Sequence, residues 1–240
     1  VGYRDLGEAL GAYIGDAGDL VRSSIQAYEL ILLVGALGKM LVMDNGTYPF
    51  VTSSNAVAGG ACAGAGIGPT HIGSAIGIAK AYTTRVGGGP CPTELEDDTG
   101  QHLRDAGAEY GSTTGRPRRC GWLDLVALRH AVVVNGLNEL AITKLDVLTV
   151  LPELKVCIAY ELDGRRLEYP PYERLEDVTP IYETLDGWDE ELSGCRRRGD
   201  LPAAAQRYLD RIEREVGCRV GVVSVGPDRE DTADLADPFG

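Results

Sequence analysis

The chain has 240 residues, 44% of them hydrophobic, and a formal net charge of −13. This length and composition suffice for a sizeable core, and we expect residues 1–240 to form a single α/β domain. The negative charge argues against binding to nucleic acid or to an anionic membrane, because a phosphate backbone requires a contiguous basic surface.

Two further classes of protein are disfavoured by what the sequence contains. No apolar run approaches ~18–20 residues, and the chain does not open on a basic segment followed by an apolar one, so we predict no membrane span and a cytoplasmic protein. The six cysteines and three histidines show no metal-ligand spacing. We therefore expect reduced, structural thiols and no metal site in this chain.

The first fifty residues predict two helices and a strand. Apolar residues recur at helical spacing over residues 1–28, with a break at Gly15–Gly18, so two short helices are expected. The apolar run from Leu30 to Val34 predicts a buried strand, and residues 35–38 after it predict a tight loop facing a ligand.

A cluster of hydroxyl and amide side chains follows the turn at residues 44–47. It consists of Thr52, Ser53, Ser54 and Asn55. Hydroxyls and amides suit a phosphate group, but they are also the preferred caps of a helix such as the one predicted to begin in residues 56–63. Both interpretations stay open.

The next segments predict a strand, a loop and a helix. β-Branched residues over 76–86 indicate one central strand, which ends in the flexible glycine loop 87–90. Val86, at the strand's end, is expected from its position alone to lie in the core. Residues 94–107 begin acidic and continue with helical spacing.

Three arginines and three hydroxyls are concentrated in residues 111–124, which we call the arginine loop. Arg116, Arg118 and Arg119 lie between flexible glycines and a following Trp-Leu-Asp. Guanidinium groups bind carboxylate and phosphate in a bidentate manner, and Gly111 and Gly115 permit close approach of a ligand to the backbone. The loop therefore predicts a site for a small anion, although arginines in a surface turn also pair with nearby acids.

Lys144 and Asp146 follow the short strand predicted at 140–143, after a helix predicted to run to about Asn135. A carboxylate placed there can accept hydrogen bonds from both the ring N–H and the exocyclic amine of guanine, and a lysine stem can cover the base. The Lys-x-Asp pattern alone is weak support for such a site.

The remaining third alternates strands and helices. The pattern predicts a strand at 153–161 with a hairpin turn at 162–165, an irregular segment at 169–188, a helix at 201–216, a strand at 219–225 and a loose tail at 228–240. Short apolar strands that alternate with helices predict a mostly parallel central sheet with flanking helices.

Five segments resemble the adenylosuccinate synthetase family, in that family's order. They are GTYPFVTSSN at 46–55, KAYTTRVG at 80–87, TTGRPRRCGWLD at 113–124, TKLDVL at 143–148 and SVGPDR at 224–229. The resemblance implies a partial P-loop-NTPase-like fold. It also implies the family's activity in AMP biosynthesis, in which GTP drives the ligation of L-aspartate to IMP and yields adenylosuccinate, GDP and phosphate.

The resemblance also implies which residues bind each substrate. For IMP they are Thr52, which takes the phosphate, Val86 and Arg116. For aspartate they are Ser112, Thr113, Thr114, Gly115, Arg116, Pro117 and Arg118. For GTP they are Arg118, Lys144, Leu145, Asp146, Ser224, Val225 and Gly226. The family further implies a homodimer and a Mg²⁺ requirement.

The chain departs from the family pattern in ways that bear on turnover. It carries Val34, Leu37, Val42 and Asn45 where relatives usually have a glutamate, a purine-binding glutamine, an aspartate and a histidine. Because it opens on Val1, we expect the catalytic aspartate and histidine, the phosphate loop, the Mg²⁺ ligands and a partner-donated arginine to lie upstream. No catalytic residue is therefore expected in this chain, and an inactive nucleotide-binding remnant or interaction module of the family is the alternative.

Overall fold

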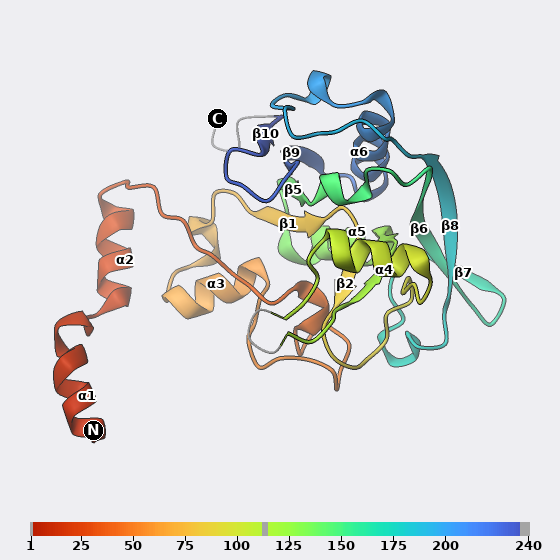
Figure 1. Cartoon of the computed structure of the whole chain (residues 1–240). Helices are drawn as coiled ribbons and strands as arrows, with labels where there is room; N and C mark the ends of the chain where they lie inside the picture. Colours follow the sequence, from red (N-terminus) through yellow and green to blue (C-terminus); the bar gives the residue numbers. More distant parts are fainter. Residues whose placement is uncertain (1, 112–114, 236–240) are drawn as a thin grey trace.

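A four-stranded sheet forms the centre of the computed structural model, which describes residues 2–111 and 115–235 (Figure 1). Its strands lie in the order β1 (Ile76–Lys80), β5 (Glu139–Thr143), β9 (Arg219–Ser224) and β10 (Thr232–Asp234). β5 pairs in parallel with β1 and with β9, and only β10 is antiparallel. The predicted α/β fold with a mostly parallel central sheet is confirmed.

A second sheet is built on the long strand β6. Its members are β4 (Leu123–Asp124), β6 (Glu153–Leu162), β7 (Arg165–Leu167) and β8 (Thr179–Asp186), and β2 (Thr83–Arg85) forms a separate ribbon with β3 (Arg119–Gly121). The prediction of an irregular segment at 169–188 was wrong over β8, which pairs with β6 along its whole length. Pro180 lies inside β8, and a proline within a strand hides it from pattern-based prediction.

Three helices pack on these sheets, and each has a recognisable beginning or end. They are α4 (Asp98–Ala106), α5 (Leu125–Asn135) and α6 (Ala203–Val216). Asp97 caps α4 and Asp124 caps α5, each by accepting a backbone N–H three residues on, at 3.0 Å. α5 and α6 both end at a glycine in the left-handed region, Gly136 and Gly217.

The remaining helices are short. They are α1 (Tyr3–Leu10), α2 (Ala17–Gln26), α3 (Ala58–Ala65) and the 3-10 turns η1 (Gly11–Tyr13), η2 (Lys39–Leu41), η3 (Pro69–His71), η4 (Leu145–Leu148), η5 (Tyr172–Arg174) and η6 (Arg198–Asp200).

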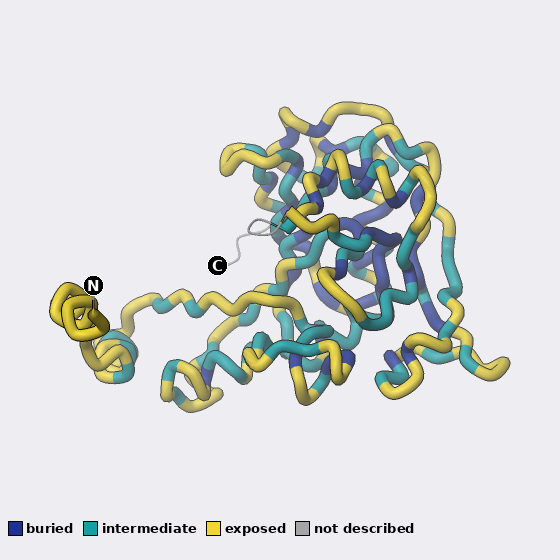
Figure 2. The backbone as a smooth tube through the Cα atoms, turned by 60° about the horizontal axis from the view of Figure 1, so that its bottom comes forward, coloured by how far each residue is buried: buried dark blue, intermediate teal, exposed yellow. Residues whose placement is uncertain are grey.

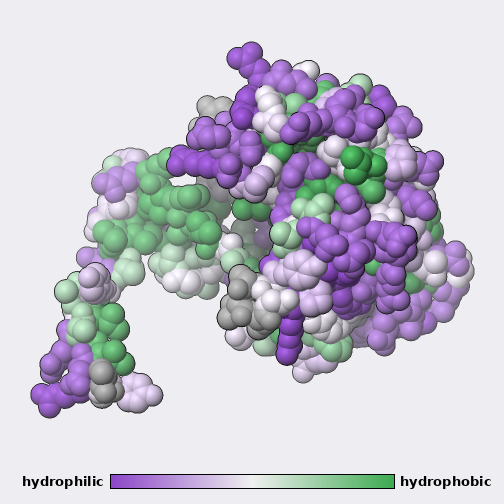
Figure 3. Space-filling view, viewed as in Figure 1, coloured by the Kyte–Doolittle hydropathy of each residue, from purple (hydrophilic) through white to green (hydrophobic). Residues whose placement is uncertain are grey.

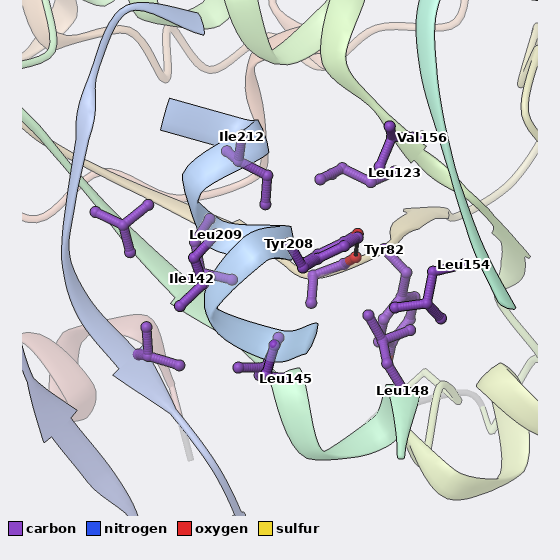
Figure 4. Close-up of a cluster of buried hydrophobic side chains, with 14 of the residues drawn as sticks. Tyr82, Leu123, Ile142, Leu145, Leu148, Leu154, Val156, Tyr208, Leu209 and Ile212 are labelled. Atoms are coloured by element: carbon purple, nitrogen blue, oxygen red, sulfur yellow. Dashed lines mark hydrogen bonds between the residues drawn. The ribbon is translucent and has the colours of Figure 1, made fainter. Parts of the chain in front are cut away.

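The core lies between α6, the central sheet and β6. Tyr208, Leu209 and Ile212 of α6 are buried, and they lie in one cluster with Ile142 of β5 and Leu145 just after it (Figure 4). The helical spacing of the three α6 residues places them on one face of the helix, which is the pattern that predicted a helix at 201–216.

The strand predicted at 76–86 is interrupted in the structure. β1 ends at Lys80 and β2 begins at Thr83, and the two residues between them, Ala81 and Tyr82, are fully buried. The hydroxyl of Tyr82 donates to the carboxylate of Glu109 at 2.7 Å. Burying this ring and satisfying its hydroxyl stabilises the bend, and a uniform β-branched pattern does not reveal it.

Residues 2–38 form an arm that extends away from the body (Figures 1 and 2). Both predicted helices are present in it, as α1 and α2. The buried strand predicted at Leu30–Val34 was wrong: this stretch forms no strand, and Leu30, Leu32 and Val34 are 75–85% exposed. Apolar side chains gather on the surface where the arm passes α3 (Figure 3). An apolar run predicts burial only where another element covers it, and the described part of the chain supplies none.

The C-terminal segment is more ordered than predicted. The expected loose tail at 228–240 contains β10, which pairs with β9 and buries Ala233 completely, whereas residues 236–240 lie outside the described part. Within the described ranges, no helix is both long and apolar enough to cross a membrane.

Candidate functional site

The carboxyl ends of β1, β5 and β9 bring three polar residues to one edge of the central sheet. Lys80 ends β1, Lys144 directly follows β5, and Ser224 ends β9. The backbone N–H of Lys144 donates to Oγ of Ser224 at 3.1 Å, which joins two of the predicted GTP-site segments. Ligands of parallel α/β sheets bind at this edge, so its position fits a binding site.

Asp146 lies in the first turn of η4 with an unsatisfied acceptor. Its Oδ1 is buried and has no hydrogen-bond partner within the described residues. Burial raises the pKa of this carboxyl, and the nearby charge of Asp231 raises it further. A buried oxygen without a donor costs about 1–3 kcal/mol, a cost that any hydrogen-bond donor reaching Oδ1 would relieve.

Three other residues of the predicted GTP set, Leu145, Val225 and Gly226, occupy tightly packed positions. Leu145 and Val225 are buried members of the main core. Gly226 lies against Asp231, whose carboxylate would collide with any Cβ placed there. The two core side chains fix the backbone, and the glycine keeps it close to the Asp231 turn.

Hydrogen bonds between its two arms close the arginine loop. Gly111 N–H donates to the carbonyl of Arg116 at 2.8 Å, and Arg118 N–H donates to the carbonyl of Glu109 at 2.8 Å. Gly115 has φ of 63°, a left-handed conformation that glycine adopts without strain. Ser112, Thr113 and Thr114, predicted to bind aspartate, lie outside the described residues.

The three arginines of the loop occupy different environments. Arg116 and Pro117 are exposed. Arg118 donates to Oε2 of Glu109 at 2.7 Å and is 29% exposed, whereas Arg119 donates through Nε to Glu94 at 2.7 Å and also to the carbonyl of Gly89 at 2.7 Å. The sequence left open that these arginines pair with nearby acids. The structure shows such pairs for Arg118 and Arg119.

Glu109 and Lys80 are site residues that the sequence did not reveal. Nζ of Lys80 lies 2.7 Å from Oε1 of Glu109, and Lys144 lies 3.0 Å from the same oxygen. Burial alone would raise the pKa of Glu109, but hydrogen bonds from Lys80, Tyr82 and Lys144 outweigh it and lower that pKa to about 2. One glutamate in an acidic protein carries no sequence signal, since its partners are brought together only by the fold.

The predicted IMP residues Thr52 and Val86 lie in two segments that Arg85 joins. Arg85 is 8% exposed and donates to Oγ1 of Thr47 at 2.8 Å and to the carbonyl of Gly88 at 2.9 Å. Val86 is 58% exposed, so its interpretation as a core valine was wrong. An exposed valine after a strand remains available to a ligand.

The hydroxyl cluster does not cap the helix that follows it. α3 begins after Val57, and the N–H of Ala58 donates to Oδ1 of Asn135 at 2.9 Å. Asn55 accepts instead from Val57 N–H at 3.3 Å. Thr52 is half-buried, and its N–H donates to the carbonyl of Leu41 at 2.8 Å. This contact fixes the backbone of Thr52. Whether its hydroxyl binds a phosphate stays a prediction.

The segment that departs from the family pattern forms an irregular loop. Leu37 has φ of 87°, a strained conformation for a residue with a branched side chain, and it is 55% exposed. Val42 is buried and bridges to Thr52, whereas the carbonyl of Asn45 accepts from Lys39. Neither Leu37 nor Val42 can offer a side-chain hydrogen bond to a purine.

The described residues do not form a metal site. Within residues 2–111 and 115–235, no group of three or more His, Cys, Asp or Glu side chains is arranged to hold an ion.

Comparisons with known proteins agree with one another. The family model described as "Adenylosuccinate synthetase" matches residues 2–233. Curated relatives named adenylosuccinate synthetase include that of Desulforudis audaxviator, 55% identical over 99% of this chain, and that of Myxococcus xanthus, 54% identical over 99%. A solved structure of fully ligated adenylosuccinate synthetase from Plasmodium falciparum matches 98% of this chain with a TM-score of 0.94 and 37% identity.

The chain spans little more than half the length of these relatives. It covers 56% of the Desulforudis sequence, 55% of the Myxococcus sequence and 57% of the Plasmodium chain.

Proposed function

This chain belongs to the adenylosuccinate synthetase family, and we propose that it takes part in that family's reaction, the GTP-dependent ligation of L-aspartate to IMP. In that reaction GTP phosphorylates the 6-oxygen of IMP, and the aspartate amine then displaces phosphate. The chain's own share would be to bind and orient the three small molecules, since positioning and charge stabilisation dominate phosphoryl transfer.

The base site carries this proposal. Lys144, Asp146 and Ser224 come from two segments about eighty residues apart, and the hydrogen bond from Lys144 N–H to Ser224 Oγ joins these segments. The buried, unpaired Oδ1 of Asp146 would accept from guanine, and the stem of Lys144 would cover the ring. Adenine presents no such pair of donors, so this site supports GTP over ATP.

The arginine loop would hold L-aspartate. Its Thr114, Gly115 and Arg116 would bind the two carboxylates together with the neighbouring residues Ser112, Thr113, Pro117 and Arg118. Arg116 would also reach IMP, and Arg118 would also reach GTP. The closed hairpin of the loop and the short contact between Arg118 and Glu109 support a preformed anion site here.

Thr52 and Val86 would contact IMP, with Thr52 on the phosphate. The proposal is supported by the half-buried position of Thr52, the exposure of Val86 and the bridge that Arg85 makes between their segments. Mg²⁺, which the family requires, would neutralise phosphate charge, but its ligands and the groups that move protons would come from elsewhere in a complete protein.

The proposed assembly and location are supported by family membership alone. We propose that the complete protein is a cytoplasmic homodimer that acts in AMP synthesis. Sedimentation of the complete protein would test the dimer, since a monomer at micromolar concentration would contradict it.

Guanine preference provides the direct test of the base site. We expect calorimetry to show tighter binding of GDP than of ADP to this chain, because each hydrogen bond to a charged group contributes roughly 1.5–3 kcal/mol. Asp146→Asn should remove most of that preference, whereas Asp163→Asn, on the exposed hairpin turn, should not. Equal binding of both nucleotides, or a preference that survives Asp146→Asn, would exclude this assignment.

Turnover separates the two classes of function considered from the sequence. Purified chain would be assayed for adenylosuccinate with GTP, IMP, L-aspartate and Mg²⁺. Adenylosuccinate formation would exclude an inactive remnant, whereas guanine-specific binding without turnover would indicate a nucleotide-binding module. In a complete relative, Arg116→Leu should weaken L-aspartate binding, and an unchanged affinity would exclude Arg116 from that site.

A further inference from the structure

A single carboxylate lies between the arginine loop and the base site. Glu109 belongs to the turn after α4, its side chain is fully buried, and it accepts hydrogen bonds from four side chains. On Oε1 these are Lys80 at 2.7 Å, Tyr82 at 2.7 Å and Lys144 at 3.0 Å; on Oε2 they are Lys80 at 2.8 Å and Arg118 at 2.7 Å. The four donors come from the end of β1, the bend after it, the arginine loop and the residue after β5.

Two of these donors are residues to which the proposed function assigns a ligand. Arg118 and Lys144 are only 29% and 34% exposed, yet both are long, flexible side chains that lose entropy when they are held in one orientation. Each contacts a different oxygen of Glu109. Lys144 is fixed further, because its Nζ also donates to the carbonyl of Gly107, in the same turn as Glu109.

The charges of this cluster do not cancel. Lys80, Arg118 and Lys144 surround one carboxylate, so the cluster keeps an excess of two positive charges beside the proposed nucleotide site. If Glu109 acted only through its charge, removing it would increase that excess and strengthen the binding of an anionic nucleotide. If it acts by holding the cations in place, removing it should weaken binding.

We propose that Glu109 is the positioning residue that holds Arg118 and Lys144 in their binding orientations, and that it thereby couples the arginine loop to the base site. This inference rests on the proposed function. In this role Glu109 acts through the two cations and not by binding a substrate itself.

The test uses the 240-residue chain and titrates GDP and ADP by NMR, which measures weak affinities. Glu109→Gln removes the charge, and Glu109→Asp keeps it on a side chain too short to reach both cations. We expect both variants to bind GDP at least about tenfold more weakly, the loss of one charge-assisted contact. In a Lys144→Ala background, Glu109→Gln should weaken GDP binding by a smaller factor than it does in the wild type, because only its effect through Arg118 remains and neighbours that act together are not additive.

Glu139→Gln is the matched control. Glu139 is also a buried glutamate that pairs with an arginine, Arg219 at 2.6 Å, but it lies at the opposite end of β5 from Lys144. We expect it to lower the unfolding temperature while leaving GDP affinity within about twofold of the wild type. This separates loss of positioning from general loss of stability.

Several results would overturn the inference, and they differ from failure of the proposed function. Tighter GDP binding by Glu109→Gln would show that only charge matters, and full additivity with Lys144→Ala would show that Glu109 does not act through that lysine. Loss of folding in both Glu109 variants would identify a purely structural residue. A wild-type chain that binds GDP and ADP equally would instead refute the proposed base site, and this inference with it.

Discussion

The backbone N–H of Lys144 donates to Oγ of Ser224 at 3.1 Å, and this one hydrogen bond joins the loop after β5 to the end of β9. Lys144 has φ of 60°, in the left-handed region, where a residue other than glycine costs of order 1–3 kcal/mol. Ser224 thus helps to hold a strained backbone at the proposed base site.

Ser224→Ala should therefore affect both stability and binding. Removing the hydroxyl leaves the N–H of Lys144 without its acceptor, which we expect to lower the free energy of unfolding by about 1 kcal/mol and to weaken GDP binding severalfold. Urea unfolding and a GDP titration measure the two effects. Ser193→Ala, which removes an exposed hydroxyl bonded to Glu191, should change neither, and equal effects of the two variants would contradict this role of Ser224.

Gly226→Ala should disturb the same edge of the sheet from another side. A Cβ at this position would collide with the carboxylate of Asp231, so either the 226–231 turn or the end of β9 must move. We expect a loss of about 1–3 kcal/mol in stability, as for other overpacked sites, and reduced GDP binding. At Gly199 a Cβ would meet no atom within 4 Å, so Gly199→Ala serves as the control. A Gly226→Ala chain as stable as the wild type would show that the 226–231 turn can move without a cost in free energy.

Acid should destabilise the protein through Glu109. Its pKa is lowered to about 2 in the folded chain, below the ordinary value of 4.5, so its contribution to stability is complete above about pH 5 and is lost as the pH falls toward 2. The shift corresponds to an effect on the order of 3 kcal/mol. Urea unfolding between pH 5 and pH 2 should show a shallower decline for Glu109→Gln than for the wild type, and parallel curves would contradict the assignment.

Tyr208→Phe tests how the core is linked to the bend between β1 and β2. The buried hydroxyl of Tyr208 donates to the carbonyl of Ala81 at 2.6 Å, and its removal leaves that buried carbonyl without this donor. We expect a loss of about 1–2 kcal/mol in thermal or urea unfolding. Tyr169 is 65% exposed, and Tyr169→Phe should be neutral. If the two variants were equally stable, the contact would contribute nothing measurable.

Much of the fold could be predicted because its elements carry local signals. α6 places its apolar residues at helical spacing, and β5 is a short apolar run ahead of a polar pair. The wrong predictions concern elements that are set by contacts between residues distant in the sequence. The bend at Ala81 and Tyr82 depends on Glu109, 27 residues away from Tyr82, and β8 depends on its pairing with β6 despite Pro180.

The sequence predicted only those residues of the candidate site that its motifs single out. Lys144, Asp146 and Ser224 were named from the sequence, and the structure joins their segments. Glu109, Lys80 and Arg85 were missed, since the ion pair of Glu109 with Lys80 and the hydrogen bond of Arg85 to Thr47 join distant residues and leave no pattern in the sequence. The roles of Thr52, Val86 and the arginine loop toward specific substrates stay predictions.

The exposed arm has a consequence for how the chain fluctuates. All residues of α1 are exposed, no residue of α2 is fully buried, and the two helices are 8 and 10 residues long. Isolated helices shorter than ~12–15 residues are marginal in water, so these two obey helix–coil equilibria rather than the cooperative transition of the core. Their amide hydrogens should exchange with solvent in the time that local unwinding takes, long before those of β5 and α6.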